Sequence, residues 1–393
     1  MLLTVNKEGL PAAIRSIGPH QASIPIFANK AEIQPLKLFQ VRTPAANAIK
    51  QEMLCVGGDA VLPVGCLVNK DKYVDILLLG TRKHYALVAP KLQQMPFFGI
   101  ADIGRELESY LQPKTIVTVL RDGRTLTYEK LRVMGILNVT PDSFYAGSRC
   151  SDVTAAVKAA ERMLQEGADI LDIGAESTRP GSSPVTEEEE KKRLLPVIKA
   201  IRQELPAAIL SVDTWRAATA EAALVCGADI VNDITAFSGD ARMAEIVARE
   251  GAAAVLMHMR GTPADMQEHC DYTHVVDEVA LYLAQRLEFA VGKGVGREKL
   301  IVDPGIGFAK SVEQNLLLLR DLQVLTGLGC PVLVAASRKS TIGTVLGGLP
   351  PEERLEGTLA TSLQAVYAGA HLVRVHDVKE NVRAIRMLEA ILQ

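Results

Sequence analysis

The segment Gly227-Ala228-Asp229-Ile230-Val231-Asn232 decides the fold, because the chain repeats its pattern along its length. A Gly-Ala pair precedes a short apolar run, and a polar residue stands where that run ends. Each copy follows an amphipathic stretch typical of a helix, so Gly is expected to cap the helix and Ala to pack in the turn. The apolar run then predicts a buried strand with one polar side chain at its C-terminal end. The other copies occupy residues 167–172, 251–258 and 369–374.

Polar residues also end four further apolar runs, at Asn138, Asp213, Asp303 and Lys339. From Lys130 onward, strand and helix patterns alternate without a break. A doubly wound open sheet shares this alternation, but it does not explain polar strand ends along the whole length. We therefore predict an α/β fold, a (β/α)8 or TIM barrel, whose polar strand ends form the active site.

Eight strands in roughly 260 residues match the usual size of such a barrel. Before the first strand, Arg121-Asp122-Gly123-Arg124 separates two β-rich runs, which predicts a β-hairpin that plugs the N-terminal mouth of the barrel. The strands are expected near residues 132–138, 168–174, 208–213, 229–233, 253–257, 299–303, 331–336 and 371–375, with helices near residues 152–166, 187–204, 215–226 and 274–293.

Residues 1–112 are predicted to form a separate small α/β domain, followed by the barrel in residues 113–393. Thr43-Pro44 is a favourable helix start, and Gly57-Gly58 is a stop. This domain shows no phosphate loop, metal cluster or catalytic pair, so its role as a cap or an oligomerisation element is left open. A strand is expected at residues 74–80 and a helix at residues 99–111.

Composition and charge exclude several classes of partner. The 43 Lys and Arg residues against 46 Asp and Glu give a formal charge of -3, which offers no attraction to nucleic acid or an anionic membrane. The apolar runs are too short to span a bilayer, and no signal peptide is evident. The six cysteines contain no C-x-x-C pair, which is typical of reduced, mostly packed thiols. We therefore expect a soluble cytoplasmic protein.

The charge run at residues 187–193 predicts a solvated helix start.

Long ordered motifs stand at the predicted strand ends. The first two are Gly135-Ile136-Leu137-Asn138-Val139-Thr140-Pro141-Asp142-Ser143-Phe144 and Asp172-Ile173-Gly174-Ala175-Glu176-Ser177-Thr178-Arg179-Pro180-Gly181. With these motifs the chain resembles the dihydropteroate synthases, within the wider pterin-binding barrels, over roughly residues 114–393. Further matching segments are residues 211–214, 231–234, 257–263, 303–308, 337–340 and 374–377.

The resemblance implies a condensation of 6-hydroxymethyl-7,8-dihydropterin diphosphate with p-aminobenzoate, releasing pyrophosphate in folate biosynthesis. It also implies a homodimer and a sulfonamide target. The arylamine is a neutral nucleophile, so no Ser-His-Asp or Cys-His pair is needed. Stabilisation of the leaving diphosphate and of a pterin cation is expected to dominate catalysis. The loops at residues 140–149 and 176–184 suit a lid that excludes water.

Pterin recognition is expected from Asp213, Asn232 and Asp303. A pterin edge resembles guanine, and a carboxylate accepts two of its donors side by side, while Asn serves donor and acceptor positions. Each of the three could instead be a polar residue of the barrel core, held in a hydrogen-bond network. By resemblance, Met257 and Lys339 also contact the pterin.

Departure of the diphosphate requires positive charge and hydrogen-bond donors. Arg374 and His376 stand two residues apart on the last strand, so both are expected on one side, near the start of a helix that favours anions. In the alternative interpretation, His376 only caps that helix. By resemblance, Asn138 contributes to a Mg²⁺ ion that bridges the diphosphate, and a single neutral protein ligand suits an ion that keeps waters and substrate oxygens.

The p-aminobenzoate site is assigned by resemblance. Lys339 lies between the two substrates, and Ser340 meets the aminobenzoate carboxylate at a helix start. Phe308 is expected to wall the pocket, although it could instead be loop packing. The other residues expected there are Phe144, Thr178, Arg179 and Pro180.

Two other functions remain open at this point. A methyltetrahydrofolate:corrinoid methyltransferase shares the barrel and pterin pocket, but it does not need the segments at residues 177–180 and 337–340. A non-catalytic pterin-binding protein is suggested by Ala146, which replaces the acidic residue usual in the first loop of the family, and by the additional N-terminal domain. The diphosphate residues argue against it, because binding pterin alone does not require them.

Overall fold

A computed structural model of the chain describes residues 10–68, 70–112, 115–139, 149–175, 185–262 and 265–392. The chain divides into two compact units, Met1–Thr115 and Ile116–Gln393. This division lies within three residues of the boundary expected between residues 112 and 113. Each unit has a hydrophobic core of its own.

The N-terminal unit contains a three-stranded antiparallel sheet in the order β1-β3-β2. Helix α3 begins at Thr43 and ends at Cys55, two residues before the predicted stop at Gly57-Gly58. Strand β3 and helix α5 confirm the other two elements predicted for this unit. The elements are α1 (Leu10–Ser16), α2 (Ile24–Ala31), β1 (Gln34–Arg42), α3 (Thr43–Cys55), β2 (Asp59–Val61), β3 (Tyr73–Gly80), α4 (Arg82–Gln93) and α5 (Ile100–Leu111).

Eight parallel strands form the sheet of the C-terminal unit, in the order β11-β10-β9-β8-β7-β6-β13-β12. Val302 and Val332 form a parallel bridge between the two ends of this sheet, which brings it round into a nearly closed barrel. The predicted TIM barrel is confirmed, although β12 is shorter than expected. The strands are β6 (Arg132–Asn138), β7 (Ile170–Gly174), β8 (Ile209–Asp213), β9 (Ile230–Asp233), β10 (Ala253–Met257), β11 (Leu300–Asp303), β12 (Leu333–Val334) and β13 (Leu372–Val375).

The Gly-Ala repeat ends four helices and starts four strands. Gly167, Gly227, Gly251 and Gly369 have φ values between +64° and +108°, a region that glycine enters without steric cost. The chain then turns directly into β7, β9, β10 and β13. Because these strands are parallel, the polar residue at the end of each copy reaches the same end of the barrel.

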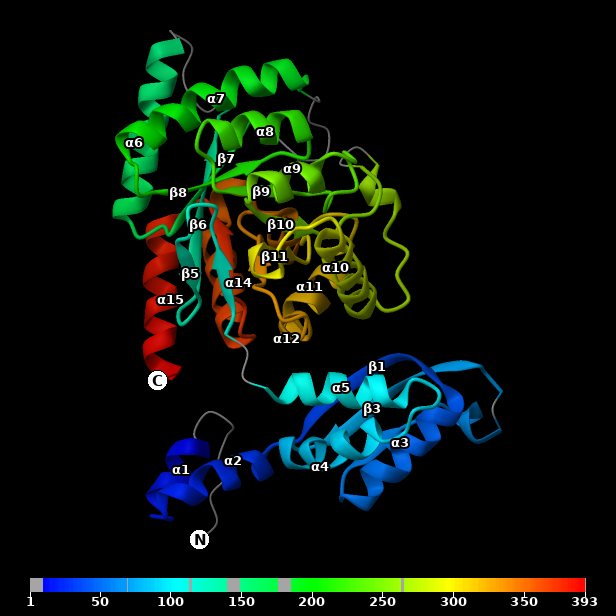
Figure 1. The fold of residues 1–393 in the computed structure, drawn as a ribbon. Coiled ribbons are helices and arrows are strands. Elements are labelled where there is room, and N and C mark those ends of the chain that lie inside the picture. Colours follow the sequence, from blue (N-terminus) through cyan, green and yellow to red (C-terminus); the bar gives the residue numbers. More distant parts are fainter. Residues whose placement is uncertain are drawn as a thin grey trace. The chain divides into compact units, whose positions relative to one another are not determined.

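Helices surround the strands of this unit (Figure 1). The four helices predicted there are confirmed as α6, α7, α8 and α10, with ends shifted by up to three residues. The helices are α6 (Arg149–Gln165), α7 (Glu187–Glu204), α8 (Ala217–Val225), α9 (Met243–Glu250), α10 (Val275–Gly292), α11 (Val312–Arg320), α12 (Gln323–Thr326), α13 (Ser340–Val345), α14 (Leu355–Tyr367) and α15 (Val378–Leu392).

The charged start of α7 is only partly solvated. Glu187 accepts a hydrogen bond from Lys191 at 2.6 Å, as the spacing predicts. Glu190, however, is 1% exposed, and it accepts hydrogen bonds from Arg216 at 3.0 Å and from Thr219 at 2.8 Å. The prediction of a solvated face is therefore wrong for Glu190, because α8 and the segment before it pack against that side of α7.

The predicted hairpin consists of β4 (Val117–Val119) and β5 (Thr125–Thr127). Leu120 and Leu126 are 1% and 6% exposed, and they share an apolar cluster with side chains near the starts of the barrel strands, such as Met134 and Ile301. Arg121 Nη1 also donates to Leu224 O at 2.6 Å, which fastens the turn to the end of α8. The hairpin therefore closes the N-terminal mouth of the barrel, as predicted.

None of the described helices is long and apolar enough to cross a membrane. The structure describes the thiols of five cysteines, and these are free, as the sequence predicts: Cys55, Cys66, Cys226, Cys270 and Cys330.

Candidate functional site at the C-terminal ends of the strands

Arg374 lies at the centre of a charged cluster at the C-terminal end of the barrel. Its Nε donates to Asp172 Oδ2 at 2.6 Å, and its Nη2 donates to Asp213 Oδ2 at 2.7 Å. Asn232 Nδ2 donates to the same Asp172 oxygen at 3.1 Å. The four residues lie on β13, β7, β8 and β9, with β6 between β13 and β7, so parallel strands of one sheet bring together side chains that are up to 202 positions apart in the sequence.

Asn138 stands beside this cluster, at the end of β6. The point that a Cβ would occupy on Gly174 lies 3.6 Å from Asp213 Oδ2 and 3.8 Å from Asn138 Oδ1. Both side-chain oxygens therefore flank the same glycine at the end of β7. The missing side chain of Gly174 leaves this space between the amide and the carboxylate open.

The cluster has more carboxylates than cations. The Asp172 side chain is fully buried, and its Oδ1 has no hydrogen-bond partner among the described residues. Burial is the main reason why the pKa of the Asp213 carboxyl is raised to about 7. The Arg374 guanidinium opposes this shift, and the Asp172 carboxylate contributes to it. One guanidinium thus serves two carboxylates. Hydrogen-bond donors of a ligand would therefore be accepted readily here.

A second group of residues follows β11. Asp303 is 3% exposed, and its Oδ1 accepts a hydrogen bond from Gly305 N at 2.7 Å. Lys339 Nζ donates to Ile306 O and lies 4.4 Å from the centre of the Phe308 ring. Burial raises the pKa of Asp303. It lowers the pKa of the Lys339 amine to about 8, although the nearby Asp303 carboxylate opposes this decrease. Lys339 therefore keeps its positive charge at neutral pH, above an aromatic ring.

Apolar side chains adjoin these charges. Met257, at the end of β10, and Phe308 are 3% and 7% exposed and belong to one small cluster with Ile234 and Met266. Trp215 packs against the same cluster. An apolar surface beside buried carboxylates suits a flat aromatic ligand with a polar edge.

Hydrogen bonds join the ends of β12 and β13. Ser337 Oγ lies 3.0 Å from His376 Nδ1. Arg338 has a φ of +57°, and its guanidinium forms a bidentate ion pair with Asp377, with Nε at 2.9 Å from Oδ2. These contacts fix the segment from which Lys339 extends, and Ser340, at the start of α13, is exposed. Strain of this kind is concentrated at functional sites.

The family model described as pterin binding enzyme matches residues 134–376. This range begins in β6 and ends at His376, so it contains every strand-end residue described above. The dihydropteroate synthase of Synechocystis sp. is 44% identical over 287 residues, covering 73% of this chain and 98% of that protein. The chain belongs to the dihydropteroate synthases. The Escherichia coli K12 member of this family is also 44% identical, over 69% of this chain and 95% of its own length.

Solved dihydropteroate synthases share the barrel. The Xanthomonas albilineans enzyme with 4-aminobenzoic acid has a TM-score of 0.66 and 42% identity, covering 70% of this chain and 98% of that chain. In Haloferax volcanii, a probable bifunctional folylpolyglutamate synthase/dihydropteroate synthase matches 88% of this chain, which spans 42% of that protein. The alignment with the Haloferax volcanii protein is too long to be confined to the barrel, so it extends into the N-terminal unit.

Several residues expected in a dihydropteroate synthase site fall outside the described part of the chain, together with most of the two loops that carry them. Among the described candidates, Arg374, Asp213 and Asn232 belong to one hydrogen-bonded cluster, and Lys339 contacts Phe308. The candidates outside the described residues are Phe144, Thr178, Arg179 and Pro180. Ala146 also lies outside them.

Asp172 is a member of this cluster to which the sequence pattern assigns no role. It links Arg374 to Asn232 from the fully buried end of the cluster. The signal was present, because Asp172 ends its copy of the Gly-Ala repeat at the position that Asn232 holds in another copy. Position in the repeat does not reveal that Asp172 binds the guanidinium of a residue on β13.

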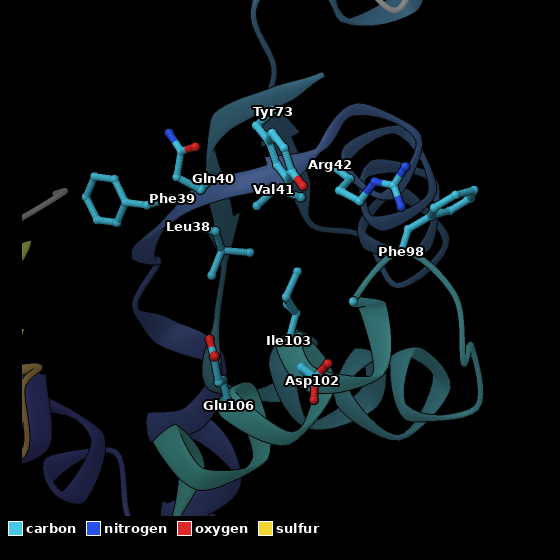
Figure 2. Close-up of a pocket in the computed structure, with 11 residues that line it drawn as sticks. Leu38, Phe39, Gln40, Val41, Arg42, Tyr73, Phe98, Asp102, Ile103 and Glu106 are labelled. Atoms are coloured by element: carbon cyan, nitrogen blue, oxygen red, sulfur yellow. The ribbon is translucent and has the colours of Figure 1, made fainter. Parts of the chain in front are cut away.

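The N-terminal unit has a pocket of about 460 Å³ between β1 and α5 (Figure 2). Leu38 and Ile103 supply apolar surface, and the carboxylates of Asp102 and Glu106 lie on the side of α5. Asp102 is exposed and paired with Arg105. Among the residues that line this pocket, no cluster of buried charges resembles the one around Arg374, so the chemistry of the synthase is assigned to the barrel.

Proposed function

We propose that the chain condenses 6-hydroxymethyl-7,8-dihydropterin diphosphate with p-aminobenzoate to give 7,8-dihydropteroate and pyrophosphate in folate biosynthesis. The cluster in which Arg374 joins Asp172 and Asp213 carries this proposal. It combines acceptors for a guanine-like edge with a cation for a leaving anion. Further support comes from the relatives named dihydropteroate synthase, which match this chain over 90% or more of their own length.

Asp213, Asn232 and Asp303 bind the polar edge of the pterin in this proposal, and Met257 supplies apolar contact. A carboxylate accepts the amino and ring N–H groups of the pterin side by side. Asp213 Oδ2 is already engaged with Arg374 at 2.7 Å. A pterin that donates to Asp213 therefore competes for this oxygen, and its binding releases part of the guanidinium toward the diphosphate.

Arg374, His376 and Asn138 bind the diphosphate. The bond between the pterin methylene carbon and the diphosphate oxygen ionises, and both electrons leave with the pyrophosphate. Fixed positive charge lowers the barrier most when it is oriented before the reaction. Asp172 keeps Arg374 oriented, because it holds Nε at 2.6 Å from a fully buried carboxylate.

A Mg²⁺ ion that bridges the diphosphate, with Asn138 as its protein ligand, is part of this proposal, and most of its ligands would come from the substrate and water. No group of three or more His, Cys, Asp or Glu residues in the described part of the chain could hold a metal ion. Asn138 would contribute a single amide oxygen, which suits an ion that keeps most of its waters and substrate oxygens. When bound, Mg²⁺ would neutralise part of the negative charge of the diphosphate.

Phe308, Lys339 and Ser340 form the described part of the p-aminobenzoate site in this proposal. The Phe308 ring supplies an apolar wall, and Ser340 binds the carboxylate at the start of α13. Lys339 lies between the two substrates, because its amine is near both Asp303 and Phe308. The arylamine attacks as a neutral nucleophile, so no general base is needed to generate it. The undescribed residues proposed for the same site are Phe144, Thr178, Arg179 and Pro180.

The proposal is tested by incubating the purified chain with dihydropterin diphosphate and measuring pyrophosphate and dihydropteroate. We expect both products to require p-aminobenzoate and to decrease when Mg²⁺ is chelated. Saturable pterin binding without turnover would instead identify a non-catalytic pterin-binding protein. Methyl transfer from methyltetrahydrofolate to a corrinoid, without dihydropteroate formation, would identify the methyltransferase.

We also propose that the chain is a homodimer, is located in the cytoplasm and is inhibited by sulfonamides. The sulfonamide proposal is supported by the Yersinia pestis dihydropteroate synthase, whose structure contains a sulfonamide drug. Light scattering coupled to gel filtration is expected to give twice the mass of the 393-residue chain. A sulfonamide is expected to compete with p-aminobenzoate in steady-state kinetics.

A further inference from the structure

Lys310 is a buried lysine for which the reaction proposed above has no role. It is 3% exposed and lies in the loop that connects β11 to α11. Its Nζ lies 3.1 Å from Gly305 O, 2.8 Å from Phe308 O and 3.0 Å from His258 Nδ1. Burial lowers the pKa of the Lys310 amine to about 7, and the three acceptors match the three hydrogens of its protonated form.

His258 supplies the third acceptor only in its neutral form. The imidazole is 2% exposed, and its ring packs edge-on against Tyr282 with the ring centres 4.8 Å apart. Burial, helped by the nearby charge of Lys310, lowers the pKa of His258 to about 2. His258 therefore stays neutral, with Nδ1 accepting from Lys310.

The loop that Lys310 holds has an unusual backbone. Gly305, Gly307 and Ala309 have φ values of +68°, +84° and +50°. A left-handed conformation at a residue with a side chain, as at Ala309, persists only where surrounding contacts enforce it. Lys310 binds one carbonyl near each end of this segment, Gly305 O and Phe308 O, and thereby supplies such contacts.

The same segment orients groups on both sides of the reacting centre. Gly305 N donates to Asp303 Oδ1 at 2.7 Å, which fixes the carboxylate proposed for the pterin edge. Ile306 O accepts the hydrogen bond from Lys339 Nζ, and the Phe308 ring lies under the same amine. A shift of this loop would therefore move Asp303, Lys339 and Phe308 together.

We propose that Lys310, with neutral His258 as its third acceptor, is a positioning residue that fixes the β11–α11 loop and aligns the pterin and p-aminobenzoate sites. Lys310 touches neither substrate and acts through the loop. This inference rests on the proposed synthase reaction. The competing interpretation is a buried lysine that contributes only to the stability of the fold, and the two differ in measurable ways.

The first test compares Lys310→Met with Asp229→Asn, a matched removal of a buried charge at the opposite end of the barrel. We expect Lys310→Met to lower kcat/KM for p-aminobenzoate by about 10- to 100-fold, because small misplacements of reacting groups have effects of this size. Asp229→Asn is expected to lower the melting temperature with kcat/KM unchanged. Equal kcat/KM values for Lys310→Met and wild type would overturn the proposal.

A double-mutant cycle with Phe308→Ala separates positioning from general destabilisation. If Lys310 acts by placing Phe308 and its loop, Lys310→Met should lower kcat/KM by less than about threefold in the Phe308→Ala background, because coupled residues are not additive. The same factor in both backgrounds would indicate two independent effects and contradict the proposal.

Hydrogen exchange provides a readout that does not depend on activity. The amides of Gly305, Gly307 and Phe308 donate to Asp303, Asn315 and Gly305, respectively. Lys310→Met should accelerate exchange in the peptide covering residues 305–310, whereas Asp229→Asn should not. If wild type makes no dihydropteroate but this difference is observed, the synthase proposal fails and the loop-fixing role stands. Unchanged exchange in an active enzyme would exclude the positioning role alone.

Discussion

The two ends of the barrel use acidic residues in opposite ways, and the Gly-Ala copy at residues 167–172 contains an acid of each kind. Asp229, just before β9, accepts hydrogen bonds from Arg202 at 2.7 Å and from Leu210 N at 2.9 Å. Asp169, just before β7, accepts in the same manner from Arg132 at 2.9 Å and from Val133 N at 2.8 Å. Each carboxylate at this end thus has at least one arginine and a backbone donor, and Asp229 also accepts from Arg124 at 3.3 Å.

At the other end of the barrel, Asp172 and Asp213 share the guanidinium of Arg374. One oxygen of Asp172 also lacks a partner among the described residues. Complete pairing at the N-terminal end favours stability, whereas shared and incomplete pairing leaves capacity for a ligand. The contrast teaches that six residues of one repeat supply both a structural acid and a functional polar group.

The largest expected effect is at the functional end. Arg374→Ala should lower kcat by roughly two to three powers of ten, because it removes one preorganised charge from the leaving diphosphate. The measurement is single-turnover dihydropteroate formation, with a melting curve to verify that the variant is folded. Near-normal turnover in a folded variant would remove Arg374 from the leaving-group role and weaken the contrast between the two ends.

At the structural end, Asp229→Asn should lower the free energy of unfolding by about 2–3 kcal/mol, because Arg202 loses the charge of a buried partner. Urea denaturation measures this change. We expect kcat and both KM values to remain within about twofold of wild type, since Asp229 lies at the end of the barrel away from the site. A large loss of kcat with unchanged stability would reverse the assignment of the two ends.

A smaller effect is expected from pH. Burial raises the pKa of Asp213 to about 7 in the free protein, and only the ionised carboxylate can accept two pterin donors. Pterin affinity should therefore fall by about tenfold for each pH unit below 7 and level off above it. Calorimetric titration with a pterin analogue from pH 5.5 to 8.5 measures this profile. Asp213→Asn should bind more weakly and lose this dependence, and an unchanged slope in that variant would assign the titration to another group.

The barrel was predictable because local patterns determine it. Apolar runs, glycine stops and amphipathic spacing indicate all eight strands, including β6 with the observed bounds, and the Asp-Gly hairpin. Less of the N-terminal unit was predicted, since β1, β2 and α4 lack comparable repeats. Glu190 was misassigned because its burial depends on Arg216 and Thr219 of a different helical segment.

The functional residues were predictable as chemical types at strand ends, but their partners were not. Nothing local in the sequence indicates that Asp172 binds Arg374, since this contact depends on the pairing of the last strand, β13, with the first barrel strand, β6. Lys310 resembles an ordinary loop lysine until the left-handed backbone at Ala309 turns the chain so that carbonyl groups face its amine. Contacts of this kind follow from tertiary structure, whereas the strand ends follow from the repeat.

A crystal structure of the chain with 7,8-dihydropteroate tests the central claim most directly. We expect the pterin edge within hydrogen-bond distance of Asp213 and Asp303, the aminobenzoate ring against Phe308, and the guanidinium of Arg374 turned away from Asp213 while still bound to Asp172. Product bound at any other place, or a pterin that leaves both carboxylates untouched, would contradict the account.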